Sequence, residues 1–314
     1  MQQSRNNVKR FGSVRMPFLP GADAEDSIAA EVTSAAGLAA YDHPMEVGAL
    51  RGQVAFVTGG GSGLGAAFAR RLAADGATVV VNDLDATAAA GIAIEVNGDT
   101  AVFDVCDAAA FDAEVDKAVE RHGRIDIMVN NAGIAPPSDP ARVQQMVANQ
   151  MARMEGRLAD MVPPDSTVSL SDADWDRMIR VHLYGTFHGT RAALRHMTPA
   201  RSGCIVNVSS VLGLRPMAGA VHYATAKAGI IAFTKSVGQE VAPYGVRVNA
   251  VCPGWIDTPL LAPMDPMMMA GIVMQIPRGR LGTVEELAEL VRFLSGPESS
   301  YCNGDVFAAS GGFA

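Results

Sequence analysis

Short apolar runs alternate with amphipathic segments from residue 52 to the end of the sequence. This alternation is the pattern of βαβ units, in which helices cover both faces of a parallel sheet. The apolar runs predict seven strands, at residues 54–57, 78–82, 101–105, 125–130, 204–208, 247–251 and 305–308. We therefore expect an α/β fold with one doubly wound, seven-stranded parallel sheet.

Helical periodicity fills the segments between the predicted strands. One apolar stripe with the spacing of a helix face is formed by Phe111, Val115, Ala118 and Val119. Thr283 and Glu286 have the spacing of a capping box. They predict that the last long helix spans residues 284–294.

Residues 1–50 precede the first predicted strand and exceed what such a domain needs. Asp26 or Ser27 is suited to cap a short helix that continues to Leu38, before Pro44. The first 22 positions hold basic residues and no acid, and no hydrophobic signal segment follows them. We expect an N-terminal extension that is partly helical or disordered.

A second additional segment, residues 135–170, interrupts the domain. Its apolar positions at helical spacing are Val143, Met146, Val147, Met154, Leu158 and Met161. Pro163 and Pro164 end the pattern. We predict an inserted amphipathic helix within a catalytic domain that spans residues 51–314.

Composition and charge exclude several classes of protein. The 314 residues are 49% hydrophobic, which is enough for a large core, and the net charge is −8 with a pI near 5.2. Because no basic block is present, we predict no nucleic-acid partner. The four cysteines lie far apart, and no apolar run reaches the roughly 20 residues of a membrane-spanning helix. We expect a soluble, cytoplasmic protein with reduced thiols, no membrane partner and no metal site.

The first predicted strand runs into a glycine-rich turn, Thr58 to Gly65, and then into an alanine-rich helix. Glycine lets the backbone turn tightly and approach a pyrophosphate, while the helix aims N–H groups and its positive end at the phosphates. A strand before and a helix after distinguish such a motif from an ordinary loop. The residues predicted to bind a dinucleotide here are Gly59, Gly61, Ser62, Gly63, Leu64 and Gly65.

Asp83 follows the second predicted strand, about 20 residues beyond the glycine turn. A carboxylate at this position accepts hydrogen bonds from an adenosine ribose and repels a ribose 2′-phosphate. The neighbouring positions hold no arginine or lysine that would neutralise such a phosphate. With the glycine turn present, we interpret Asp83 as a determinant of NAD binding rather than as an ordinary exposed aspartate.

Tyr223 and Lys227 lie four positions apart, which places a phenol and an ammonium on one face of a helix. A phenol is a poor base at neutral pH unless its anion is stabilised, and a nearby cation lowers its pKa. By itself, such a pair is usually an ordinary surface pair. Its interpretation as an acid–base centre depends on the motifs that accompany it.

These motifs together resemble the short-chain dehydrogenase/reductase family, from about residue 52 to residue 312. The glycine turn resembles the family's Thr-Gly-x-x-x-Gly-x-Gly motif, and the segment from Tyr223 to Lys227 resembles its Tyr-x-x-x-Lys motif. Ser210 stands 13 residues before Tyr223, which is the family's spacing for its catalytic serine. The resemblance implies a Rossmann-like fold with Ser210, Tyr223 and Lys227 as catalytic residues.

Further matches in the same order extend the cofactor site. Residues 130–133 resemble the family's Asn-Asn-Ala-Gly, residues 104–105 its adenine-contacting pair, and residues 249–258 its nicotinamide-contacting segment. The resemblance implies that the cofactor is also held by Asp104, Val105, Asn131, Ala132, Gly133, Tyr223, Lys227, Pro253, Gly254, Ile256 and Thr258.

Two positions depart from the family pattern. His182 stands where the family has an asparagine that completes a catalytic tetrad by positioning a water next to the lysine. If the imidazole replaces that amide, its titration near pH 6.5 predicts a loss of oxidation rate below about that pH. The alternative is that a backbone carbonyl holds the water. Ser310 replaces the aspartate of the family's Asp-Gly-Gly, which bears on packing or assembly.

The segment after Trp255 holds methionines and leucines between prolines that argue against one continuous helix. In the family this segment is a mobile flap over the substrate, and methionine suits adaptable apolar contacts. A plain core helix is the alternative. Met217 and His222 flank the catalytic segment and could contact substrate, although packing and surface positions are more usual for them. The family also implies a homo-oligomer, a tetramer or a dimer.

We therefore predict an NAD-dependent alcohol dehydrogenase or carbonyl reductase that interconverts a secondary alcohol and a ketone on a lipophilic small molecule. Tyr223 would exchange the proton, Ser210 would bind the reacting oxygen, and Lys227 would lower the tyrosine pKa. A 3-oxoacyl-thioester reductase is the enzymatic alternative, disfavoured because such enzymes commonly take NADPH. A cofactor sensor or scaffold without turnover is the non-enzymatic alternative.

Overall fold

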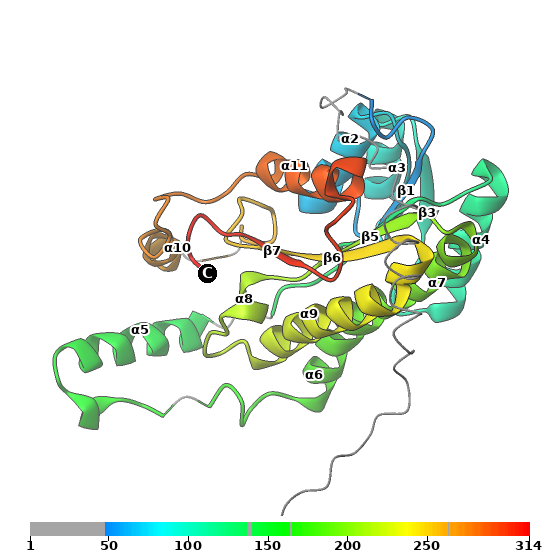
Figure 1. Cartoon of the computed structure of the whole chain (residues 1–314). Helices are drawn as coiled ribbons and strands as arrows, with labels where there is room; N and C mark the ends of the chain where they lie inside the picture. The colour runs from blue at the N-terminus through cyan, green and yellow to red at the C-terminus, as the bar shows by residue number, and fades with distance from the viewer. Residues whose placement is uncertain (1–47, 137–139, 164, 263, 265) are drawn as a thin grey trace, which may run out of the picture. The chain divides into compact units, whose positions relative to one another are not determined.

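One sheet of seven parallel strands forms the centre of the protein (Figure 1). The computed structural model describes residues 48–136, 140–163, 165–262, 264 and 266–314. The strands are β1 (Val54–Val57), β2 (Thr78–Asp83), β3 (Asp99–Val102), β4 (Ile127–Asn130), β5 (Gly203–Val208), β6 (Val246–Pro253) and β7 (Val306–Ala309). Their order is β3-β2-β1-β4-β5-β6-β7. The predicted Rossmann-like, doubly wound α/β fold is confirmed.

Helices cover both faces of the sheet, as predicted (Figure 1). One face carries α2 (Gly63–Ala74), α3 (Ala86–Glu95) and α11 (Val284–Ser295), and the other carries α4 (Ala108–His122), α7 (Gly185–Ala200) and α9 (Val221–Val241). Alternate residues of β1 enter the two cores: Ala55 and Val57 join the first, and Val54 and Phe56 join the second. Burial on both faces explains why the strands are continuous apolar runs.

Shorter elements connect these layers. They are α5 (Pro140–Met154), α6 (Asp172–Ile179), a π-helical turn (Arg180–Tyr184), α8 (Val211–Leu214), α10 (Pro266–Val273) and the 3-10 turns Leu158–Asp160, Ala242–Tyr244 and Pro297–Ser299. The helix predicted between residues 26 and 38 lies outside the described residues. Within the described part of the chain, no helix is both long and apolar enough to span a membrane.

Two helices pack and begin as their sequences indicate. In α4, the predicted stripe is buried at Phe111, Val115 and Ala118 and partly buried at Val119. At the start of α11, the Glu286 N–H donates to Thr283 Oγ1 (3.3 Å) and the Thr283 N–H donates to Glu286 Oε2 (2.9 Å). The predicted capping box is therefore present.

The third strand lies earlier in the chain than the predicted range 101–105. It pairs with β2 only as far as Val102, which lies opposite Asp83, the last residue of β2. Beyond that point, the side chain of Asn82 donates to the carbonyl of Phe103 (3.1 Å). The strand therefore ends where its neighbour ends, and the apolar pattern of one strand does not contain that information.

The inserted helix α5 is shorter than predicted. It ends at Met154, whereas the apolar pattern continues to Met161. Gly156 has a left-handed φ of +74°, and the Arg157 N–H donates to the carbonyl of Ala152 (2.8 Å), which closes the helix. The glycine is the signal that the apolar periodicity alone overlooks.

Candidate active site

The glycine-rich turn follows β1, where the strand order reverses between β2 and β4. In open α/β sheets the ligand crevice lies at this point, beyond the carboxyl ends of the strands. Gly59 and Gly63 have φ values of +61° and +51°, the left-handed region that favours glycine. A side chain on Gly65 would collide with the carbonyl oxygen of Gly59. The Ser62 side chain makes no capping bond, which leaves the first N–H groups of α2 to an anion. The side chain of Leu64 is partly buried and packs against the core.

The end of β4 is hydrogen-bonded to this turn. The Asn131 side chain donates to the carbonyls of Thr58 (2.9 Å) and Gly59 (3.2 Å). The Thr58 hydroxyl accepts the backbone N–H groups of Asn131 (2.9 Å) and Ala132 (3.0 Å). Asn131 and Ala132 therefore fix the shape of the turn, in addition to lying where the family motif expects cofactor contacts.

Asp83 lies beside the turn, as its position at the end of β2 predicts. Its Oδ2 accepts the N–H of Gly61 (3.0 Å), and its Oδ1 accepts the N–H of Asp85 (3.2 Å). A Cβ on Gly61 would lie 2.8 Å from Asp83 Oδ2, so glycine is required for this approach. The carboxylate is only partly exposed and is held in one orientation at the rim of the crevice.

Asp104 and Val105 form a loop directly after β3. Asp104 Oδ1 accepts the N–H of Cys106 (2.8 Å), which shapes the loop. The carbonyl of Val105 is bonded to Nδ1 of His188 on α7 (3.0 Å). His188 is buried, and the sequence offers no motif that would single it out. It ties the predicted adenine-binding loop to the helix layer beneath it.

Ser210, Tyr223 and Lys227 meet at the carboxyl end of β5. Ser210 caps α8, where its Oγ accepts the N–H of Leu212 (3.1 Å), and Tyr223 lies in the first turn of α9. Lys227 lies one turn later, and its Nζ donates to the carbonyl of Val208 (2.9 Å). The Nζ is 5.6 Å from the centre of the Tyr223 ring. The structure thus brings together all three residues that the motifs predict.

Two small residues set the spacing between α8 and α9. A Cβ on Gly213 would lie 2.8 Å from the backbone of Lys227, so a larger residue would separate the helices. The Ser209 hydroxyl donates to the carbonyl of Lys227 (2.7 Å). The serine and the tyrosine–lysine pair come from different helices, and this close packing fixes their relative position.

Comparison with known proteins agrees with this geometry. The sequence matches the short chain dehydrogenase family over residues 53–268. The chain belongs to that family. It is 35% identical over 268 residues to a 3-oxoacyl-(acyl-carrier-protein) reductase of Thermotoga maritima, with 84% of this chain and 98% of the relative covered. It is 37% identical over 265 residues to a cis-4-hydroxycyclohexanecarboxylate dehydrogenase of Sinomonas cyclohexanicum, with 83% and 96% covered.

A 3-oxoacyl-(acyl-carrier-protein) reductase of Escherichia coli is 34% identical over 263 residues, with 83% of this chain and 97% of the relative covered. The resemblance that the motifs indicate is therefore confirmed. The short-chain dehydrogenases are oxidoreductases that bind a nicotinamide cofactor, and the residues present fit such a group. The orphan N–H groups of α2 and the glycine cradle suit a pyrophosphate.

In this dehydrogenase, residues after β6 return to the glycine turn. Pro253 ends β6, and the Gly254 N–H donates to the carbonyl of Ala309, the last residue of β7 (2.9 Å). Ile256 is buried and forms an isolated parallel β-bridge with Gly282, just before α11. Thr258 lies beside the turn, because a Cβ on Gly63 would be 3.9 Å from Thr258 Cβ. The predicted nicotinamide segment and the predicted phosphate turn are therefore neighbours.

Burial governs the ionisation of Tyr223 and Lys227. It lowers the pKa of Lys227 from 10.5 to about 7. It also raises the pKa of Tyr223 above its usual value, against the opposing effect of the hydrogen bond with Ser210. We expected Lys227 to lower the tyrosine pKa. Desolvation of the phenolate is instead the largest effect on this pKa, and it raises the value.

His182 lies in the π-helical turn between α6 and α7 and is buried against Tyr223. Its Nε2 is 3.0 Å from the carbonyl of Ile134, and its buried Nδ1 has no hydrogen-bond partner. Burial and the charge of Lys227 hold the pKa of His182 well below 6.5. The expected ionisation near pH 6.5 is therefore wrong for this imidazole, because a charged ring is disfavoured at this buried position beside a cation.

His222 departs from the usual surface position, whereas Met217 has the packing role that is usual for a methionine. His222 is buried, and neither of its ring nitrogens has a hydrogen-bond partner. Burial lowers the pKa of its imidazole. Met217 packs against an apolar cluster beside the catalytic residues. The surface position expected for His222 is wrong, because α9 turns its face toward the protein interior at this point.

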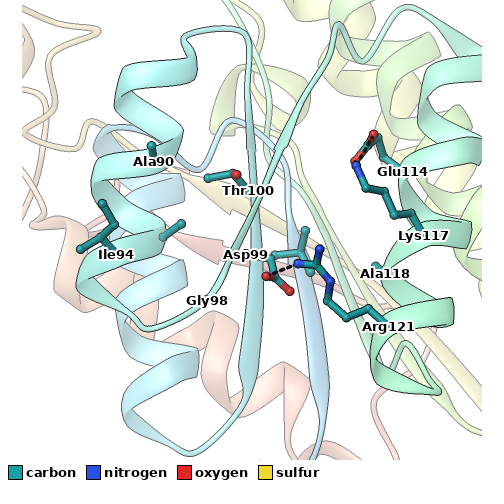
Figure 2. Close-up of a pocket in the computed structure, with 11 residues that line it drawn as sticks. Ala90, Ile94, Gly98, Asp99, Thr100, Glu114, Lys117, Ala118 and Arg121 are labelled. Atoms are coloured by element: carbon teal, nitrogen blue, oxygen red, sulfur yellow. Dashed lines mark hydrogen bonds and ion pairs between the residues drawn. The ribbon is translucent and has the colours of Figure 1, made fainter.

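A hollow of about 420 Å³ lies between α3 and α4, at the outer edge of the sheet (Figure 2). Ion pairs of Lys117 with Glu114 and of Arg121 with Asp99 line it. Asp99 begins β3, whereas the glycine turn and the catalytic residues follow the carboxyl ends of strands. This hollow is therefore separate from the active site. Among the described residues, no group of three His, Cys, Asp or Glu side chains is placed to hold a metal ion.

Proposed function

We propose that this dehydrogenase uses NAD to interconvert a secondary alcohol and a ketone on a lipophilic substrate. The observation that carries the proposal is the convergence of Ser210, Tyr223 and Lys227 beside an apolar cluster. NAD, when bound, supplies the nicotinamide carbon that accepts or returns the hydride. The protein side chains supply binding, orientation and a path for the proton.

Each catalytic side chain has a role that follows from its position. Tyr223 takes the proton of the substrate hydroxyl during oxidation and returns it during reduction. Ser210 holds the same oxygen and favours the tyrosine anion through its hydrogen bond. Lys227, held by the carbonyl of Val208, lies beside the tyrosine ring, and when charged it would also hold the ribose of the nicotinamide nucleotide. His182 provides an unpartnered Nδ1 that is suited to hold a water next to this centre.

The preference for NAD rests on Asp83. Its carboxylate is fixed by the N–H groups of Gly61 and Asp85, so it cannot turn away from an adenosine ribose without losing both bonds. A 2′-phosphate there would meet a like charge, and no lysine or arginine adjoins Asp83 in the sequence.

A 3-oxoacyl-thioester reductase is the second candidate, and the names of two relatives favour it. The relative from Sinomonas cyclohexanicum is named for a cyclic secondary alcohol, which favours the first candidate. The deciding experiment follows the absorbance of the reduced nicotinamide with NAD, NADP, a panel of secondary alcohols and a 3-oxoacyl thioester. Turnover of cyclic alcohols with NAD supports the proposal. Turnover of the thioester alone, with NADPH, contradicts it, and cofactor binding without any turnover would favour a sensor.

We also propose that the insertion covers the substrate entrance. A Cβ on Gly219 would lie 3.8 Å from Met146 Sδ and 4.0 Å from Ser166 Oγ, so the insertion lies against the loop that leads to Tyr223. Deletion of residues 137–168 should raise KM for every accepted substrate. A change in oligomer mass without a change in KM would instead make the insertion a subunit contact.

A homotetramer is the proposed assembly. Tyr184, the last residue of the π-helical turn, and Phe187, in the first turn of α7, are 51% and 41% exposed, which is unusual for neighbouring aromatic side chains. Light scattering of the wild type and of Phe187→Glu tests this proposal. The charge should reduce the mass of the particle if α7 is a subunit contact, and an unchanged mass would place the contact elsewhere.

A further inference from the structure

The hollow between α3 and α4 lies at an edge of the central sheet (Figure 2). β3 is the first strand in the sheet order, and among the described residues no strand pairs with its outer side. The space beside β3 is therefore left to the side chains of the two helices that flank it. Its volume of about 420 Å³ is within the range of small-molecule sites. Neither the proposed hydride transfer nor the predicted cofactor contacts use it.

One wall of the hollow is apolar. α3 contributes Ala90, Ala93 and Ile94 to this wall, and the side chain of Ile94 is 81% exposed. A Cβ on Gly98 would collide with the carbonyl oxygen of Val79, so no larger side chain can fill the hollow at that position. The lining is completed by Val80, Thr100 and Ala118. An apolar group of a ligand would be sheltered against Ile94, which is otherwise exposed to water.

The opposite wall is charged and belongs to α4. Glu114, Lys117 and Arg121 lie three and four positions apart, so their side chains share one face of the helix. Figure 2 shows Lys117 paired with Glu114 and Arg121 paired with Asp99. The two acids and two bases that line the hollow carry no net charge. A ligand with a single charge would therefore separate one pair and leave one of its members without a partner.

Both ion pairs can exchange partners with a ligand at little cost. The side chains of Lys117 and Glu114 are 59% and 25% exposed, and exposed ion pairs stabilise a fold only slightly. Asp99 is bonded to His122 Nε2 (2.6 Å) as well as to Arg121, so it keeps a partner when Arg121 turns toward a ligand. Lys117 and Arg121 are about one helical turn apart, and at this spacing one carboxylate can contact both.

We propose that this hollow binds an α-amino acid with an apolar side chain. The carboxylate lies between Lys117 and Arg121, the ammonium lies against Glu114, and the side chain lies against Ile94. Such a zwitterion leaves every charge on this face of α4 with a partner of opposite sign, which neither a simple carboxylate nor a simple amine does. The site does not rest on the proposed function, because Asp99 begins β3 and the predicted adenine-binding loop follows the other end of that strand.

The ligand class is tested with L-leucine and two analogues of similar shape, 4-methylpentanoate, which lacks the ammonium, and 3-methylbutylamine, which lacks the carboxylate. Binding is followed by the ¹³C-methyl NMR signal of Ile94, which is assigned with Ile94→Val. L-Leucine should shift this signal and bind about fivefold more tightly than either analogue, because each analogue loses one ion pair. Equal affinity for 4-methylpentanoate and L-leucine overturns the proposal, as does a signal that none of the three compounds shifts.

The position of the site is tested by repeating the titration with saturating NAD. L-Leucine should shift the Ile94 signal equally with and without NAD, because the hollow is separate from the glycine turn. A shift that NAD abolishes would place the amino acid in the cofactor site and overturn the proposal.

Two substitutions test the charged wall, and each has a control outside the hollow. Lys117→Met should weaken L-leucine binding about fivefold, whereas Lys235→Met, at an exposed position on α9, should not change it. Glu114→Gln should weaken L-leucine binding to a similar extent without weakening that of 4-methylpentanoate. Glu120→Gln, at an exposed position of the same helix, should change neither. Unchanged affinity for L-leucine in both Lys117→Met and Glu114→Gln overturns the proposed contacts.

Discussion

The imidazole of His182 stands edge-on to the ring of Tyr223, with centroids 5.3 Å apart and planes inclined by 85°. Gly133 makes room for this contact, because a Cβ there would lie 2.6 Å from His182 Cε1. The π-helical turn that carries His182 is a rare conformation, and such turns are frequent at functional sites. The departure from the family's asparagine is therefore accommodated by both the helix and the neighbouring glycine.

Gly133→Ala should destabilise the protein by about 1–3 kcal/mol, because the added methyl group would overlap His182. Gly91→Ala is the matched control, since a Cβ on Gly91 meets nothing within 4 Å. Urea denaturation measures both free energies of unfolding. His182→Ala should recover part of the loss in the Gly133→Ala background, and equal stability of the two glycine variants would contradict the contact.

His182 should make the protein less stable in acid. Its pKa is well below 6.5 in the folded protein because of burial and the charge of Lys227, while in the unfolded chain it titrates near 6.5. Below about pH 6.5 the unfolded state therefore binds more protons, and the free energy of unfolding falls as pH decreases. His182→Asn should make this fall smaller between about pH 7 and pH 5 in urea titrations.

The same low pKa predicts that the rate of alcohol oxidation has no ionisation from His182 near pH 6.5. The pH profiles of kcat for the wild type and for His182→Asn should therefore have the same shape in this range. An inflection that disappears only in the variant would show that the imidazole titrates during catalysis.

Lys227 should make the protein more stable as pH rises. Burial lowers its pKa to about 7, whereas the unfolded value is 10.5, so the unfolded state binds more protons between these values. Relative to Lys227→Met, the wild type should gain at most about 1.4 kcal/mol per pH unit above neutral pH. Lys235→Met, on the exposed face of the same helix, should keep the gain. A difference between wild type and Lys227→Met that does not vary with pH would contradict a depressed pKa.

Tyr223→Phe should abolish turnover and leave NAD affinity nearly unchanged, because it removes the acid–base oxygen and keeps the ring beside Lys227. Steady-state kinetics and a thermal shift with NAD measure the two effects. Tyr301→Phe, at an exposed position, should retain full activity. Substantial turnover in Tyr223→Phe would exclude it as the base.

Asp83 should determine the choice between NAD and NADP. The wild type should have a higher kcat/KM with NAD than with NADP. Each 1.4 kcal/mol of unfavourable contact between Asp83 and the 2′-phosphate of NADP corresponds to about a tenfold difference. Asp83→Ala combined with Leu84→Arg should reduce or reverse the ratio of kcat/KM for NAD to that for NADP. The double variant replaces a negative side chain, which repels the 2′-phosphate, by a positive one that attracts it. A wild type that prefers NADP would refute this interpretation of the end of β2.

The sequence by itself determined the class of fold and the candidate site residues. Apolar runs predicted all seven strands because both faces of a parallel sheet are buried, and that pattern is local. The glycine turn, Asp83, Ser210 and the Tyr223–Lys227 pair were found for the same reason, since each motif is defined by spacing along the chain. Where the end of a strand depends on the neighbouring strand, as at β3, the predicted range differs from the observed one.

Only the tertiary structure decided the environment of those residues. The low pKa of Lys227 and His182 results from burial by distant segments, which no local pattern records. The bond from His188 to Val105 joins residues 83 positions apart, and that from Arg215 to Phe313 joins residues 98 apart. Packing brings such partners together, and a sequence specifies packing only through the whole fold. The surroundings of Ser210, Tyr223 and Lys227 were therefore beyond the sequence, although the positions of these residues along the chain were not.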